Sequence, residues 1–138
     1  HKRNKTGSVT APIIGGNLSI ICSLLGTNNE LKTKNTILFI EDVSENLYRI
    51  DRMLIQLKRA GILESLAGLV VGHFTNMEDN KIKFGKNAYE IIQEAVAIYD
   101  YPVCYGFPAG HEAENMPIKL GATLELSVAK STSTLPFI

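Results

Sequence analysis

The sequence has no tryptophan, few aromatic residues and no excess of either charge. Its 14 basic residues balance 14 acidic residues. This balance argues against nucleic-acid and membrane-surface partners, because both usually require a basic excess. The longest apolar stretches, such as TILFI, are far shorter than the ~20 residues that a bilayer-spanning helix needs. We therefore expect neither a nucleic-acid-binding protein nor a membrane protein.

Cysteine is also scarce, since only Cys22 and Cys104 are present. They are far apart and form no C-x-x-C pair, which argues against a disulfide framework and against a cysteine zinc site. No segment resembles a signal peptide. Both observations predict a reducing compartment, and hence a cytoplasmic protein.

The residues that are present suffice for one folded domain. Hydrophobic residues make up 45% of the 138 positions, enough for a substantial core. Buried strands are predicted at TILFIE, LAGLVVGHF and PVCYG, and further strands at KLGATLELSV and STLPFI. Residues 7–16 are predicted to form an edge or bent strand, because Pro12 interrupts a β-rich run.

Three stretches have the apolar spacing of helices: residues 18–25, 45–60 and 86–99. Asn17 is the expected N-cap of the first, and Asp42 or Ser44 that of the second. Helices that alternate with strands in this way predict parallel β units. We therefore predict an α/β fold: a compact mixed sheet with about three helices, in which the strand-rich ends complete the sheet or curl it toward a barrel.

Two polar residues follow buried strands that are far apart in the sequence. Glu41 ends TILFIE, and His111 ends the loop GFPAGH after PVCYG. Ligands collect at the carboxyl ends of parallel strands, so these two side chains are candidate neighbours across 70 positions. A carboxylate beside an imidazole fixes its tautomer and stabilises its cation, as in a hydrolytic triad. Glu41 and His111 are thus the candidate catalytic residues.

Each of these residues also has an ordinary structural interpretation. A glutamate at a strand end is often a solvated or capping carboxylate, and a histidine in a Gly/Pro loop is often structural. The sequence offers no nucleophile to complete a triad. Cys22 and Cys104 fall in apolar runs typical of core residues, and no G-x-S-x-G motif is present. A catalytic serine would have to come from outside this chain.

The sequence contains candidate residues for two other kinds of site, a metal site and an anion-binding turn. HEAEN is not H-E-x-x-H, and a metal site made of His73, His111 and Glu41 lacks the usual ligand spacing, so no metal and no cofactor is expected. Gly15, Gly16 and Asn17 resemble an anion-binding turn before a helix, but a tight turn with an N-cap is the favoured interpretation because these residues are common in turns.

Four blocks in order are similar to the C-terminal domain of the LD-carboxypeptidase family, also called the muramoyltetrapeptide carboxypeptidase or S66 serine peptidase family. They are GGNLSIICSLLGT, ILFIEDVSENLYRIDRMLIQLKRAGIL, GLVVGHF and YPVCYGFPAGHEAENMPIKLGATLEL. The resemblance runs from about residue 7 to residue 128. It implies that residues 1–138 form a single C-terminal catalytic domain of the swivelling β/β/α type, in an enzyme whose N-terminal domain carries the serine nucleophile.

The resemblance also implies roles for the two candidate residues. Glu41 corresponds to the glutamate and His111 to the histidine of a Ser-Glu-His triad. The family removes the terminal D-alanine from murein tetrapeptides in cytoplasmic cell-wall recycling, and a related branch confers immunity to microcin C-type compounds. The implied partners are therefore the murein peptide, the N-terminal domain and a second copy of the chain in a homodimer. This chain alone is expected to be inactive. The alternatives are a microcin C-type immunity hydrolase of the same family and a non-enzymatic binding module.

Overall fold

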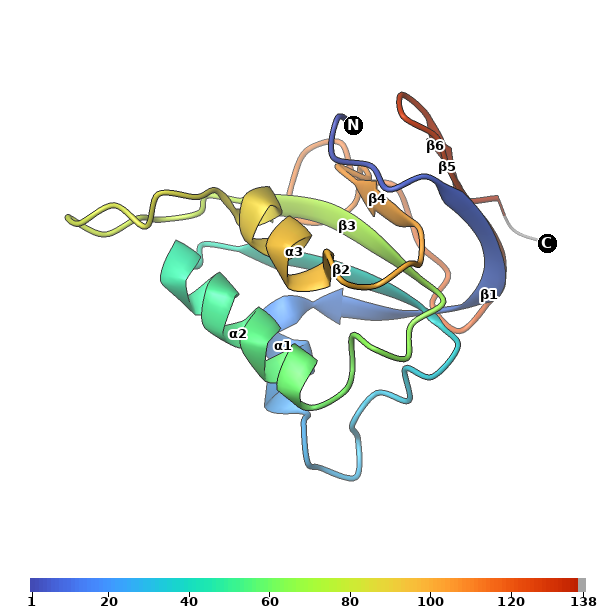
Figure 1. Cartoon of the computed structure of the whole chain (residues 1–138), viewed down its shortest axis with the longest axis horizontal. Helices are drawn as coiled ribbons and strands as arrows, with labels where there is room; N and C mark the ends of the chain where they lie inside the picture. The colour runs from blue at the N-terminus through green and yellow to red at the C-terminus, as the bar shows by residue number, and fades with distance from the viewer. Residues whose placement is uncertain (137–138) are drawn as a thin grey trace.

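The computed structural model describes residues 1–136, which form one six-stranded mixed sheet. Its spatial order is β4-β3-β2-β1-β5-β6, and the first four of these strands are parallel (Figure 1). The strands are β1 (Gly7–Asn17), β2 (Ile37–Val43), β3 (Gly68–Thr75), β4 (Val103–Tyr105), β5 (Thr123–Val128) and β6 (Ser133–Thr134). The predicted α/β class with a mixed sheet is confirmed. The sheet is open rather than a closed barrel, with β4 and β6 at its two edges.

The helices connect the parallel strands in sequence. They are α1 (Leu18–Ser23), α2 (Leu47–Arg59) and α3 (Ala88–Val96), after β1, β2 and β3 respectively. Each crossover moves to the adjacent strand in the same direction. Because such connections are right-handed, all three helices lie on one face of the sheet (Figure 1). The opposite face is left for the chain that follows β4.

Alternation along β2 divides its side chains between two cores. Leu38 and Ile40 belong to the core under the helices, whereas Ile37 and Phe39 belong to the core on the helix-free face. All four side chains are buried. Continued alternation places Glu41 on the helix-free face and Asp42 on the helix face. This one-residue difference decides what the two carboxylates do.

Strand β1 is bent, as predicted, but it is not at an edge. Residues Gly7 to Pro12 pair with the antiparallel β5, and residues Ile13 to Asn17 pair with the parallel β2. Pro12, which lacks an N–H, lies where the strand changes partner, so the break in pairing accommodates it. In Figure 1, β1 curves around the end of the sheet as this exchange requires.

All three helices are shorter than the sequence pattern predicted. The first helix ends at Ser23, and α3 begins after Asn87, which forms a capping box with Glu90. The N-cap of α2 is Asn46, so the prediction of Asp42 or Ser44 as its cap was wrong. In the strand predicted at STLPFI, the described pairing covers only Ser133–Thr134, and residues 137–138 lie outside the described part of the chain. None of the helices in residues 1–136 has the length and apolar character to cross a membrane.

Candidate active site

Glu41 and His111 are in direct contact. Nδ1 of His111 lies 2.7 Å from Oε2 of Glu41, although 70 positions separate them in sequence. The Glu41 side chain is 8% exposed and the His111 side chain 54% exposed. The carboxylate is therefore a buried support, and the imidazole presents part of its ring to the outside. The neighbour relationship expected from the sequence is present.

The His111 loop reaches Glu41 because it continues along β3 after β4 has ended. Phe107 donates its N–H to the carbonyl of Val71 (3.0 Å), and His73 donates its N–H to the carbonyl of Ala109 (2.9 Å). These backbone bonds carry the loop over the helix-free face. Ala109 is buried there against the second core, directly before Gly110 and His111.

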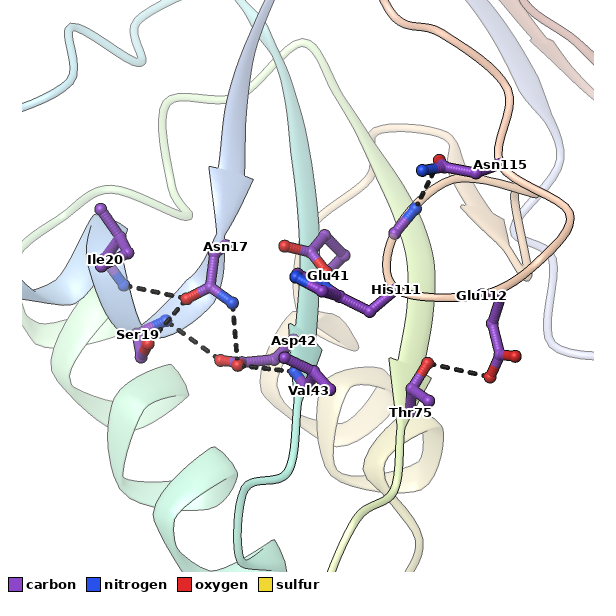
Figure 2. Close-up of polar contacts among 11 residues, drawn as sticks. Asn17, Ser19, Ile20, Glu41, Asp42, Val43, Thr75, His111, Glu112 and Asn115 are labelled. Atoms are coloured by element: carbon purple, nitrogen blue, oxygen red, sulfur yellow. Dashed lines mark hydrogen bonds and ion pairs between the residues drawn. The ribbon is translucent and has the colours of Figure 1, made fainter.

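Gly110 gives the loop its final turn toward Glu41. Its φ of +133° is rarely adopted by L residues, and a Cβ on it would lie 3.3 Å from Oε2 of Glu41. The N–H of Gly110 donates to Oδ1 of Asn115 (3.1 Å), and Thr75 Oγ1 donates to Oε1 of Glu112 (2.9 Å), as Figure 2 shows. The loop is thus fixed by hydrogen bonds on both sides of His111.

An irregularity in the β2–β3 ladder occurs at Glu41. Ile40 pairs with Val71 and Asp42 pairs with Phe74, so Gly72 and His73 together oppose the single residue Glu41. Such a bulge is common beside active sites because it redirects side chains. It also brings a second imidazole near the loop, since the Cβ of His73 lies 3.2 Å from a Cβ built on Gly110. Nε2 of His73 is buried and has no hydrogen-bond partner within residues 1–136.

Asp42 anchors the other side of β2. Its Oδ1 accepts from Asn17 Nδ2 (2.9 Å) and from the N–H of Val43 (2.8 Å), and its Oδ2 accepts from the N–H of Ser19 (3.1 Å) (Figure 2). Asp42 is 2% exposed. Sequence reasoning missed this role and assigned the residue to the wrong helix. The alternation of β2, which puts Asp42 on the helix face when Glu41 faces the other way, was the signal for it.

The contacts at the start of α1 also distinguish the two interpretations of Gly15, Gly16 and Asn17, an anion-binding site or an N-cap of the helix. Asn17 Oδ1 accepts from the N–H of Ile20 (3.2 Å), while Asp42 takes the N–H of Ser19. The start of α1 is therefore occupied by the protein's own acceptors. Gly15 is required for close packing, because a Cβ there would lie 1.9 Å from the carbonyl oxygen of Phe39. The N-cap is therefore observed, but the tight turn is not: Gly15 and Gly16 continue strand β1 and pair with Phe39 and Ile40 of β2.

A shallow pocket of about 390 Å³ opens beside the Glu41–His111 pair. Besides those two residues and Asn115, its lining is largely apolar. It comprises Phe39, Ala109, Gly110, Met116, Pro117, Ile118 and Leu120. Met116 and Leu120 are each 51% exposed. The pair therefore borders an open pocket in which partly exposed apolar side chains lie beside polar groups.

The comparisons with known proteins identify this architecture. Residues 10–126 match the family model described as the LD-carboxypeptidase C-terminal domain. The chain belongs to the LD-carboxypeptidase family.

The named relatives of this LD-carboxypeptidase domain agree with this family assignment. The probable murein peptide carboxypeptidase of Bacillus subtilis is 34% identical over 129 residues, which are 94% of this chain and 40% of that protein. The murein tetrapeptide carboxypeptidase of Pseudomonas aeruginosa is 31% identical over 127 residues, 91% of this chain and 39% of that protein. The crystal structure of muramoyltetrapeptide carboxypeptidase from Oxalobacter formigenes matches with a TM-score of 0.88 at 30% identity, covering 98% of this chain and 46% of that chain. The chain thus spans less than half the length of these relatives.

The cysteines of this LD-carboxypeptidase domain are poor nucleophiles. Burial, with a further contribution from Asp42, raises the pKa of the Cys22 thiol to about 11, and burial raises the pKa of Cys104. Thiolates are the reactive form, so both thiols are suppressed at neutral pH. The structure groups no three potential metal ligands around a common point within the described residues.

Proposed function

We propose that this domain supplies the general base and its orienting carboxylate to a serine-type L,D-carboxypeptidase that removes the terminal D-alanine from murein tetrapeptides. The observation that carries the proposal is the 2.7 Å contact between His111 Nδ1 and Glu41 Oε2. With Nδ1 held by a buried carboxylate, the other ring nitrogen, Nε2, is left to exchange a proton with a substrate or nucleophile.

In the proposed reaction, Nε2 of His111 removes the proton from a serine hydroxyl as the oxygen attacks the carbonyl of the scissile L,D-peptide bond. Glu41 keeps the other ring proton on Nδ1 and stabilises the imidazolium. His111 then returns its proton to the nitrogen of the departing D-alanine, which leaves an acyl-enzyme. Water, deprotonated by His111, hydrolyses that ester and regenerates the serine.

The serine is proposed to come from an N-terminal domain of the same polypeptide. Three observations support this assignment. The relatives are more than twice as long as the matched region, both cysteines are suppressed, and the Ser19 hydroxyl is engaged by Asn17 (2.6 Å). On this proposal, residues 1–138 have no hydrolytic activity alone, and the complete enzyme works in the cytoplasm on peptides recovered from the cell wall.

A further relative suggests a second possible class of substrate. The Microcin C7 self-immunity protein MccF of Escherichia coli is 26% identical over 122 residues. The higher identity to proteins named murein peptide carboxypeptidases favours the murein substrate. An aminoacyl sulfamoyl adenosine is the appropriate comparison compound, since MccF has been solved with the aspartyl form.

The test uses the complete enzyme, with this domain joined to its own N-terminal domain. D-alanine released from a murein tetrapeptide is measured for the wild type and for His111→Ala. We expect a loss of at least about 10³-fold in kcat, as for removal of a triad member. Lys130→Ala, an exposed change distant in sequence from the site, is the control. Full activity of His111→Ala would refute the proposed role, and exclusive cleavage of the sulfamoyl adenosine would assign the second substrate class.

A further inference from the structure

Glu41 lies at a point where regular strand pairing fails on one side of β2. The β2–β3 register shifts between Ile40 and Asp42, so Glu41 has no paired Cα in β3. On the other side the β1–β2 ladder reaches its last pair, Asn17 with Glu41. Pairing with β3 resumes at Asp42 and Val43, but Glu41 itself is unpaired on that side and is the last paired residue on the β1 side. Contacts of its neighbour on the β1 side can therefore add a restraint on its orientation.

The contacts of Asp42 supply this restraint. They join the end of β2 to the end of β1 through Asn17 and to the start of α1 through the N–H of Ser19. Oδ1 also accepts from the N–H of Val43, which immobilises the carboxylate relative to its own strand. Three donors to a carboxylate with 2% exposure form a charge-assisted and well-shielded set of hydrogen bonds.

We propose that Asp42 is a positioning residue for catalysis: it fixes the end of β2 so that the neighbouring Glu41 carboxylate stays in line with Nδ1 of His111. This inference rests on the proposed function. Asp42 lies on the helix face and Glu41 on the opposite face, so Asp42 acts through the backbone and does not touch the reacting atoms.

Asp42→Asn is the informative change because an amide cannot satisfy the three donors. Oδ1 and Oδ2 both accept N–H groups, so either orientation of the asparagine amide sets its NH₂ against at least one donor. The side chain keeps its size. The expected effect is a shifted strand end rather than a cavity.

Exchanging the residues at positions 17 and 42 should restore most of the hydrogen bonds that Asp42 makes. In Asn17→Asp/Asp42→Asn, the new aspartate accepts from the new asparagine, with the bond reversed. The asparagine oxygen still accepts from Ser19 N–H, and the aspartate still accepts from Ile20 N–H. The bond from Val43 is the single loss. The double variant is therefore a rescue test based on hydrogen-bond direction.

The experiment measures kcat and KM of the complete enzyme on a murein tetrapeptide. Because small misplacements of a catalytic group cost up to about 10²-fold, we expect Asp42→Asn to lower kcat by about 10- to 100-fold with KM within about twofold, and the exchange variant to regain at least about fivefold. Ser23→Ala is the matched control: it removes a hydrogen bond to Ile20 from the same helix and should leave kcat unchanged.

The outcomes separate this inference from the proposed function. If His111→Ala is inactive but folded Asp42→Asn has wild-type kcat, the positioning role is wrong and the triad role stands. If the exchange variant is folded and gains nothing over Asp42→Asn, the positioning role is also wrong. If His111→Ala is fully active, the proposed function itself fails. Should Asp42→Asn not fold by circular dichroism, Asn17→Ala, which removes one of the three donors, is judged by the same split between kcat and KM.

Discussion

Gly72 faces the carbonyl oxygen of Ala109 so closely that a Cβ on Gly72 would lie 2.4 Å from that oxygen. The same Cβ would lie 2.8 Å from the ring of Phe39. The absence of a side chain at position 72 thus allows the loop with His111 to rest on β3. A backbone oxygen and a packed ring cannot move aside as the end of a flexible side chain can. The close contact at Gly72 therefore determines how near the loop lies to β3.

Gly72→Ala should lift this loop. Overpacking of this kind costs about 1–3 kcal/mol of unfolding free energy, measurable by denaturant titration. We also expect lower kcat in the complete enzyme, since His111 moves with the loop. Gly85→Ala is the comparison, because a Cβ there meets nothing within 4 Å and bears only the cost of its φ of +83°. A Gly72→Ala variant with wild-type stability would show that the close contact at Gly72 is not limiting.

Glu41→Gln should damage catalysis while preserving the shape of the site. A glutamine NH₂ directed at Nδ1 of His111 favours the tautomer with its proton on Nε2, which cannot act as the base. By analogy with such changes in serine proteases, we expect kcat to fall by about 10³- to 10⁴-fold with little change in KM. Glu114→Gln, an exposed change in the same loop, serves as the control. Steady-state D-alanine release distinguishes the two, and a Glu41→Gln enzyme with normal kcat would contradict the orienting role.

Alkaline pH should destabilise the domain. Burial raises the pKa of Cys22 to about 11 and raises the pKa of Cys104, Tyr101 and Tyr105 as well. Between about pH 9 and pH 11 the unfolded chain loses protons from these groups that the folded chain retains. The free energy of unfolding therefore falls as pH rises through this window.

Urea unfolding at pH 7.5, 9 and 10.5 tests this dependence. We expect the free energy of unfolding to change little between pH 7.5 and the ordinary pKa values of these groups. Above those pKa values it should decline. Cys22→Ala should make the decline shallower, because one of the contributing groups is gone. A stability that rises between pH 9 and 10.5 would contradict the predicted sign.

Most of the fold was predictable because local patterns and the topology agree. The apolar spacing of α2, for example, matches the buried residues Ile50, Leu54 and Leu57 that face the sheet. The place of β1 was not predictable in the same way. Pro12 normally marks an edge, and its tolerance inside the sheet depends on an exchange between β5 and β2 that involves segments over 80 residues apart.

The candidate site was predictable in outline, because residues that follow parallel strands share one edge of the sheet. That rule brought Glu41 and His111 together. It carries no information on the bulge opposite Glu41, which depends on the register between β2 and β3, nor on the hydrogen bond between Asn17 and Asp42. Both features arise from tertiary packing. They lie beside the site because the β1–β2 pairing ends there and the β2–β3 register shifts there.

The exchange of partners along β1 has a consequence for biosynthesis. Residues Ile13 to Asn17 can dock on β2 once the chain as far as Glu41 has left the ribosome, since their partners are residues Ile37 to Glu41. Residues Gly7 to Pro12 wait for β5, whose last paired residue is Val128. During translation, the partner of one half of β1 therefore becomes available early, whereas the other half has no pairing partner until β5 has been synthesised.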